Sequence, residues 1–173
     1  RPGDGLYVTG TLGDALAGLR VVQEGRTSSA SQTERFLMSR FFRPIPRVAE
    51  IGSLLSADVV PTAMSDISDG LARTVRTICE RSQTGALIRA RDLPLSEALC
   101  DFARGRSSEL AWEGGEDYEL LLTLAPEDRE RALSVARGIG LSLSEIGEIR
   151  ATAGDVVVDG LPDATTPGFD HFS

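Results

Sequence analysis

Residues 60–89, VPTAMSDISDGLARTVRTICERSQTGALIR, contain one complete structural unit: a strand, a loop, a helix and a second strand. Residues 60–64 are β-prone. Residues 71–82 place apolar side chains at the i, i+4, i+7 and i+8 spacing of one helical face. Those side chains are Leu71, Val75, Ile78 and Cys79. Gly85 favours the end of this helix, and residues 86–89 are expected to form the second strand.

Outside this unit the chain predicts further strands and helices in mixed order. Strands are expected at residues 6–10, 118–124, 141–149 and 156–159, and helices at residues 14–23, 34–42, 48–55, 95–102 and 127–137. Residues 43–46 contain two prolines and separate two of the helices, and residues 105–108 are expected to be a loop. Because the elements do not follow a strict βαβ rhythm, we expect an α/β (α+β) fold, with a mixed β-sheet flanked by helices, in a single domain of residues 1–173.

Composition and charge exclude several classes of function. The chain has 173 residues and a formal net charge of −8, which argues against a general nucleic-acid partner. No apolar run approaches the roughly 20 residues of a membrane span, so no membrane partner is expected. The two cysteines, Cys79 and Cys100, are predicted to be buried or half-buried free thiols, as in a reducing cytoplasm.

The basic residues are all arginine, because the chain contains no lysine. This excludes the lysine of a Walker A loop, a Schiff-base lysine and the strand lysine of protein kinases. His171 is the only histidine, which excludes a histidine-rich zinc site. Any chemistry must therefore use carboxylates, hydroxyls, arginines and backbone N–H groups.

The first candidate site is the sequence Ser-Asp-Ile-Ser-Asp-Gly at residues 65–70. Asp66 and Asp69 are three residues apart in a turn, so both carboxylates can reach one hard cation. Ser68 and the free N–H groups of the following helix can bind a phosphate beside that cation. The alternative is helix capping, with Ser68 or Asp69 as the N-cap and Asp66 in solvent, and spacing alone favours this alternative.

The second candidate site is the sequence Gly-Gly-Glu-Asp-Tyr-Glu at residues 114–119. Paired glycines allow a ligand to approach the backbone closely, or they allow a positive φ, and acidic residues follow them directly. The alternative is a tight turn into the next strand, with Glu116, Asp117 and Glu119 at its solvent-exposed end. The local pattern favours this turn.

Two weaker patterns remain. The turn of residues 10–14, Gly-Thr-Leu-Gly-Asp, resembles a phosphate cradle, but it lacks the lysine and the spacing of a P-loop, so a packing turn is favoured. The tail of residues 167–172 contains Phe169 and Phe172. These rings either anchor the tail in the core or stack on a flat ring of a ligand, and core anchoring is favoured by the pattern alone.

Taken in order, these strings resemble the thiamine-monophosphate kinase family. They are YVTGTLGD at residues 7–14, DISDGL at 66–71, GGEDYEL at 114–120 and GFDHF at 168–172, and residues 40–47 and 92–96 fit as well. The resemblance runs along the whole chain. It implies the two-domain architecture of aminoimidazole ribonucleotide synthetase, in which this chain corresponds to the C-terminal α/β domain. It also reverses the preference for the capping and turn alternatives.

The resemblance implies an activity and a set of site residues. The activity is transfer of the γ-phosphoryl group of ATP to thiamine monophosphate, which gives thiamine diphosphate in the biosynthesis of that cofactor. Asp66 and Asp69 would be magnesium ligands, and Ser68 would contact an ATP phosphate. Glu116 and Phe169 would contact the thiamine substrate. The implied cofactor is Mg²⁺, ATP is the co-substrate, and no side-chain nucleophile is expected.

The resemblance also implies a missing part. The N-terminal domain of the family supplies most of the magnesium-binding aspartates, much of the ATP site and the homodimer interface, and it would precede Arg1. Two aspartates on one loop cannot offset the charge of ATP and a phosphorylated acceptor, so we expect the chain alone to fold but not to catalyse transfer. The alternatives are another ATP-binding member of the superfamily, such as a selenophosphate synthetase, and a non-catalytic ligand-binding module.

Overall fold

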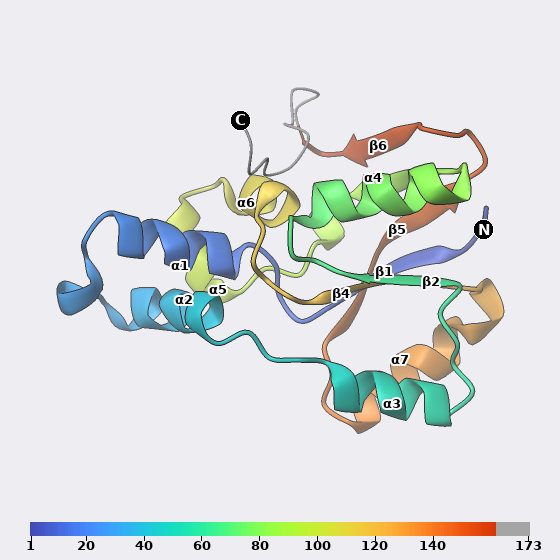
Figure 1. Cartoon of the computed structure of the whole chain (residues 1–173), viewed down its shortest axis with the longest axis horizontal. Coiled ribbons are helices and arrows are strands. Elements are labelled where there is room, and N and C mark those ends of the chain that lie inside the picture. The colour runs from blue at the N-terminus through green and yellow to red at the C-terminus, as the bar shows by residue number, and fades with distance from the viewer. Residues whose placement is uncertain (162–173) are drawn as a thin grey trace.

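The structure is a computed structural model that describes residues 1–161, and its centre is a six-stranded sheet (Figure 1). The strands are β1 (Gly5–Thr9), β2 (Ala63–Asp66), β3 (Gly85–Arg89), β4 (Leu120–Leu124), β5 (Leu143–Arg150) and β6 (Val156–Asp159). They lie in the order β2-β4-β1-β5-β3-β6. Neighbouring strands pair antiparallel, except β3 and β6, which pair parallel. The predicted mixed sheet is confirmed.

Seven α-helices surround this sheet within the described residues. They are α1 (Asp14–Gln23), α2 (Gln32–Phe42), α3 (Val48–Ser56), α4 (Leu71–Ser82), α5 (Glu97–Ala103), α6 (Ser107–Glu113) and α7 (Arg129–Gly138). Helix α4 covers one face of the sheet, and α3 and α7 cover the other (Figure 1). Helices α1, α2, α5 and α6 pack together as a helical lobe beside the sheet (Figure 1).

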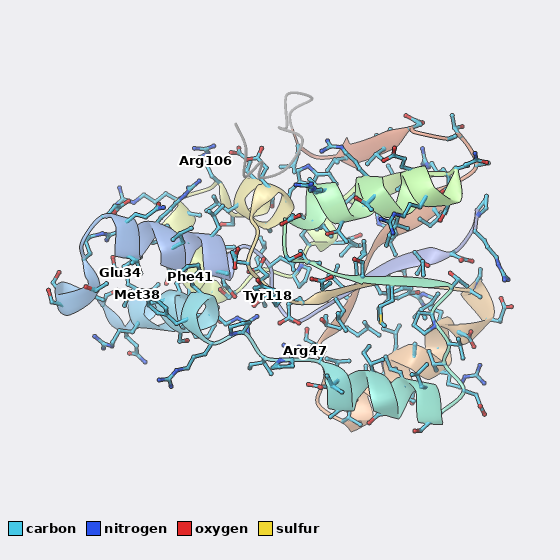
Figure 2. All side chains as sticks on the ribbon, viewed as in Figure 1. Glu34, Met38, Phe41, Arg47, Arg106 and Tyr118 are labelled. Atoms are coloured by element: carbon cyan, nitrogen blue, oxygen red, sulfur yellow. The ribbon has the colours of Figure 1, made fainter. Side chains whose placement is uncertain are left out.

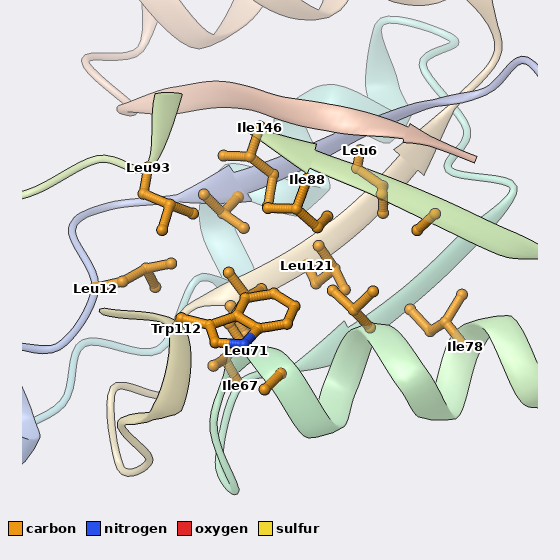
Figure 3. Packing of buried hydrophobic residues seen from close by; sticks show 14 of the residues in the cluster. Leu6, Leu12, Ile67, Leu71, Ile78, Ile88, Leu93, Trp112, Leu121 and Ile146 are labelled. Carbon is orange, nitrogen blue, oxygen red and sulfur yellow. The ribbon is translucent and has the colours of Figure 1, made fainter. Parts of the chain in front are cut away.

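The alternation of side chains along the strands divides the core into two layers. Leu121 of β4 belongs to the cluster beneath α4, where it packs with Leu71 and the fully buried Trp112 (Figure 3). The next residue, Leu122, points to the opposite face and packs with Leu54 in the cluster that α3 and α7 cover. A third, smaller cluster lies inside the helical lobe.

Three elements differ most from the sequence-based expectation, and the bounds of several others shift by one or two residues. Residues 105–108 were expected to be a loop, but α6 begins at Ser107, and burial of its apolar side chains supports a short helix that has no side-chain N-cap. Strand β4 begins at Leu120 and not at residue 118, because Tyr118 has a φ of 51°, outside the β region. Strand β2 begins after Pro61, which has no N–H group for the sheet.

The state of the two cysteines and the presence of membrane spans were also predicted from the sequence. Cys79 and Cys100 are both free, and Cys79 is buried, but Cys100 is exposed and not half-buried as predicted. No helix within residues 1–161 is long and apolar enough to cross a membrane.

Gly18 lies where α1 and α2 touch, since a Cβ added there would be 2.2 Å from the carbonyl oxygen of Leu37. We expect Gly18→Ala to lower the free energy of unfolding by about 1–3 kcal/mol, because the two helices must separate. Gly52 of α3 is the matched control, since an added Cβ meets nothing within 4 Å. Gly52→Ala should raise stability by about 0.5–1 kcal/mol. Urea unfolding measures both changes, and changes of the same sign would contradict this packing.

Candidate functional site

Two loops that are distant in sequence lie side by side at one edge of the sheet. They are the acidic loop (residues 66–70), which begins with the last residue of β2, and the glycine loop (residues 114–119), which leads into β4. The N–H group of Glu116 donates a hydrogen bond of 2.7 Å to the carbonyl oxygen of Ser68. A Cβ added to Gly115 would lie 2.6 Å from the same oxygen. The fold therefore brings the two strongest candidate sites of the sequence together.

Three carboxylates of these loops affect the ionisation of Tyr118. The charge of Glu116 has the largest effect and raises the pKa of Tyr118, followed by partial burial and a hydrogen-bonding interaction with Glu116. The charges of Asp66 and Asp69 raise this pKa further. Asp66 is exposed, and the Asp69 side chain is 38% exposed and lies 3.5 Å from a guanidinium nitrogen of Arg73. The site is therefore accessible to solvent and negatively charged.

The helix-capping alternative for the acidic loop is wrong in this structure. The N-cap of α4 is Gly70, with a φ of 95° and no side-chain capping bond, so neither Ser68 nor Asp69 occupies that position. A Cβ added to Gly70 would lie 2.7 Å from the carbonyl oxygen of Glu113, so only glycine fits there. The N-cap residue of α4 therefore provides no side-chain acceptor for the first N–H groups.

The oxygen donors of Asp66 and Asp69 are the ligand type that Mg²⁺ prefers. Among the residues that the structure describes, however, no group of three or more His, Cys, Asp and Glu side chains could hold a metal ion. These two aspartates therefore fit magnesium only as part of a larger ligand set. Phe169, predicted to contact the substrate, lies outside the described residues.

Asp117 and Glu119 are buried and do not form the solvent-exposed end of a strand, as the turn alternative predicted. They are 2% and 1% exposed, respectively. Asp117 accepts hydrogen bonds from the N–H groups of Gly13 (2.7 Å) and Ala15 (3.1 Å) at the start of α1. Burial raises its pKa to about 7, against the opposing effect of these two bonds. The glycine turn that resembles a phosphate cradle thus binds a carboxylate of its own chain.

Glu119 joins three separate segments through one buried carboxylate. It accepts hydrogen bonds from Thr9 Oγ1 (2.6 Å), Arg40 Nη2 (2.7 Å), and Nε and Nη2 of Arg47 (2.7 and 2.6 Å). Burial raises its pKa, but the bonds from Arg47, Thr9 and Arg40 outweigh burial, so the pKa lies below the ordinary value. Arg40, in the last turn of α2, and Arg47, at the start of α3, lie on either side of the proline-containing segment. Both bind Glu119, so this carboxylate fixes the position of that segment.

The strained backbone of the site lies at residues other than the paired glycines. Gly114 has a φ of −68°, and Gly115 is not among the positive-φ residues, so neither glycine is required by its backbone conformation. Both are needed for close packing, because an added Cβ would lie 2.5 Å from the carbonyl oxygen of Leu110 or 2.6 Å from that of Ser68. Glu116 and Tyr118 have φ values of 71° and 51°. The sequence predicts neither these positive φ values nor the anchoring roles of Asp117 and Glu119, because nothing local in it distinguishes a buried acid from an exposed one.

Glu119→Gln tests this ion-pair cluster. The substitution removes the charge that both largely buried arginines share, and within the described residues it leaves Arg40 only Asp14 at 3.8 Å and Arg47 only Glu50 at 3.2 Å. We therefore expect the free energy of unfolding to fall by about 3–5 kcal/mol. Glu130→Gln is the control, because the Glu130 side chain is 84% exposed, and a change within about 0.5 kcal/mol is expected. Chemical unfolding at neutral pH measures both values, and equal effects would contradict the role of Glu119.

The same variant gives a pH dependence with a defined sign. Because the pKa of Glu119 is lowered in the folded state, its stabilisation is present above the ordinary carboxyl pKa of about 4.3 and is lost as the pH falls through the folded-state pKa. The wild type should therefore lose more stability than Glu119→Gln on acidification below about pH 4.3. Parallel pH profiles of the two proteins would show that Glu119 does not titrate as described.

Comparisons with known proteins identify the family of this chain. A family model described as AIR synthase related protein, C-terminal domain, matches residues 1–160. The thiamine-monophosphate kinase of Haemophilus influenzae is 36% identical over 177 residues, which cover 98% of this chain and 53% of that protein. The chain spans about half the length of the curated relatives it matches.

Two solved structures show the same similarity. The thiamine-monophosphate kinase from Stenotrophomonas maltophilia K279a has a TM-score of 0.82 at 36% identity, covering 92% of this chain and 51% of that chain. A structure described as AaThiL complexed with AMPPCP and TMP has a TM-score of 0.83 at 32% identity, covering 99% of this chain and 52% of that chain.

Proposed function

This chain belongs to the family described as AIR synthase related protein, C-terminal domain, and from that premise we propose that it is the C-terminal half of a thiamine-monophosphate kinase. The proposed reaction transfers the γ-phosphoryl group of ATP to thiamine monophosphate and gives thiamine diphosphate. The observation that carries the proposal is the meeting of the acidic loop, which contains Asp66 and Asp69, with the glycine loop, which contains Glu116, through a backbone hydrogen bond of 2.7 Å. The similarity to thiamine-monophosphate kinases over nearly the whole chain supports it.

Asp66 and Asp69 have the proposed role of magnesium ligands. When bound, Mg²⁺ would offset the negative charge of the nucleotide and of the phosphorylated acceptor. The two aspartates would supply part of the ligand set. The rest would come from an N-terminal domain, which we also propose as the site of most ATP contacts and of a homodimer interface. The length of the relatives supports this division, since this chain covers about half of each.

Ser68 and the start of α4 are the proposed contacts for a phosphate of ATP. Helix α4 has twelve residues, and its N-cap, Gly70, provides no side-chain acceptor for the first N–H groups. An N-terminus of this kind attracts anions through its N–H groups and its dipole. This feature distinguishes α4 from α1, whose N-terminal N–H groups are already bonded to Asp117.

Glu116 is the proposed contact for the thiamine part of the substrate. Thiamine carries a cationic thiazolium ring and an amino group on its pyrimidine ring, and a carboxylate can pair with either of them. The backbone bond from Glu116 to Ser68 holds this carboxylate close to the proposed phosphate site. Transfer would then depend on positioning and electrostatics, without a covalent intermediate on a side chain.

The proposal is tested by assaying phosphoryl transfer from ATP to thiamine monophosphate, with the chain alone and with the chain joined to its N-terminal domain. We expect activity only in the two-domain protein. Asp66→Asn or Asp69→Asn should then lower the rate by about 100-fold or more, because an amide is a poor magnesium ligand, while unfolding free energies change by about 1 kcal/mol or less.

Asp101→Asn is the control for these variants, because Asp101 is exposed on α5. It should leave the rate unchanged. Normal turnover by both Asp66→Asn and Asp69→Asn would remove the proposed metal-binding role. Absence of transfer in the two-domain protein with magnesium and both substrates present would contradict the proposed function itself.

A further inference from the structure

A pocket of about 500 Å³ lies where the end of α2, the segment before α3 and the turn after β1 meet. Figure 2 shows Arg47, one of its lining residues, at the point where the helical lobe meets the sheet. The polar lining consists of three arginines and three hydroxyl-bearing residues: Arg40, Arg43, Arg47, Thr11, Ser39 and Ser142. Within residues 1–161 no carboxylate lines this pocket, although the chain has a formal net charge of −8.

The carboxylates that pair with two of these arginines lie outside the pocket. Glu119 accepts hydrogen bonds from Arg40 and Arg47, and it is 1% exposed. Asp14 is fully buried and lies 3.8 Å from Nε of Arg40. Glu50 pairs with Arg47 from within α3. These acids hold two guanidinium groups in fixed positions and do not themselves contribute to the lining of the pocket.

Arg43 is the arginine of this pocket whose charge is not offset. It is exposed at the C-terminus of α2, and within residues 1–161 its side chain forms no ion pair and no hydrogen bond. The buried Nε of Arg40 also has no hydrogen-bond partner in the described part of the chain. An unpaired guanidinium can bind a phosphate group through two parallel N–H···O hydrogen bonds. The pocket is therefore suited to an anion of this kind.

The backbone of the turn after β1 is already bonded within the chain. Gly10 and Thr11 of this turn line the pocket. The N–H group of Gly10, however, donates to the carbonyl oxygen of Ser142, and that of Gly13 donates to Asp117. An anion in the pocket would consequently be bound by arginine side chains and not by the turn, whose pattern resembles a phosphate cradle.

The apolar part of the lining indicates what the anion carries. Phe36 and Ile45 line the pocket and are 43% and 51% exposed. Neither belongs to the core clusters of the described residues. Exposed apolar side chains beside a group of cations favour an anion with an organic group over a free inorganic ion, because the organic group covers them.

We propose that this pocket binds a small organic phosphate monoester. Arg43 is the principal contact of the phosphate group, with Arg40 beside it, and Phe36 and Ile45 contact the organic group. No residue of the acidic loop or of the glycine loop lines the pocket. The inference therefore goes beyond the proposed function and does not depend on it.

The test is titration of the 173-residue chain, without magnesium, with inorganic phosphate and with phenyl phosphate, followed by NMR of the arginine Nε–H groups. We expect phenyl phosphate to bind about threefold to tenfold more tightly, since one aromatic contact contributes this much. Arg43→Gln should weaken binding of both compounds by about 10-fold, the contribution of one charge-assisted contact. Phe36→Ala should remove the preference for phenyl phosphate and leave binding of inorganic phosphate unchanged.

Arg20→Gln is the matched control, because Arg20 is exposed on α1, does not line the pocket and carries the same charge. It should bind both compounds as the wild type does. Equal losses in Arg43→Gln and Arg20→Gln would show attraction by surface charge alone and would overturn the proposal. Unchanged binding by Arg43→Gln, or no saturable binding of phenyl phosphate by the wild type, would also overturn it. None of these outcomes depends on whether the two-domain protein transfers phosphate.

Discussion

The buried ion pairs of the Glu119 carboxylate with Arg40 and Arg47 determine how the rest of the site is arranged. They connect the end of α2 and the start of α3 to the residue before β4, across 79 and 72 positions of sequence. Burying these charges is costly, and the four hydrogen bonds to Glu119 offset that cost. The space around the Glu119 carboxylate is also restricted, since a Cβ on Gly10 would lie 2.1 Å from one of its oxygens. The carboxylate thus fixes β1, β4 and the segment between the helices together.

This constraint explains how one short loop has both structural and functional residues. Asp117 and Glu119 point inward, where one caps α1 and the other binds the two arginines. Glu116 and Tyr118 alternate with them and are accessible to solvent. The inward pair holds the outward pair beside the acidic loop in a positive-φ backbone conformation that residues other than glycine rarely adopt. The proposed substrate contact of Glu116 therefore depends on buried groups that touch no substrate.

Local patterns predicted much of the fold, because periodic apolar spacing does not depend on distant residues. Helices α1 and α4 have the predicted bounds, Asp14–Gln23 and Leu71–Ser82. Helix α6 was missed because its short sequence depends on tertiary burial, with Trp112 fully inside the core. The capping alternative was wrong because Gly70, and not one of the polar residues before it, occupies the N-cap position.

The candidate site was harder to predict, because its decisive contacts are long-range. Glu116 and the acidic loop were identified from ordered strings that resemble a family, and the fold brings them together. The burial of Glu119 could not be predicted locally, because its arginine partners are far away in sequence. The sequence shows three arginines at residues 40, 43 and 47 around two prolines, but it does not show that Arg40 and Arg47, and not the exposed Arg43, bind Glu119.

Amide hydrogen exchange of the Glu119→Gln variant, under conditions where it stays folded, tests most directly whether the buried carboxylate holds the glycine loop in place. In the wild type the N–H groups of Glu116 and Tyr118 are bonded to the carbonyl oxygens of Ser68 and Ile67. We predict that the variant exchanges these two amides much faster, while amides in the middle of α4 and β5 keep their wild-type protection. Unchanged protection at Glu116 and Tyr118, or a uniform increase over the whole chain, would contradict the account.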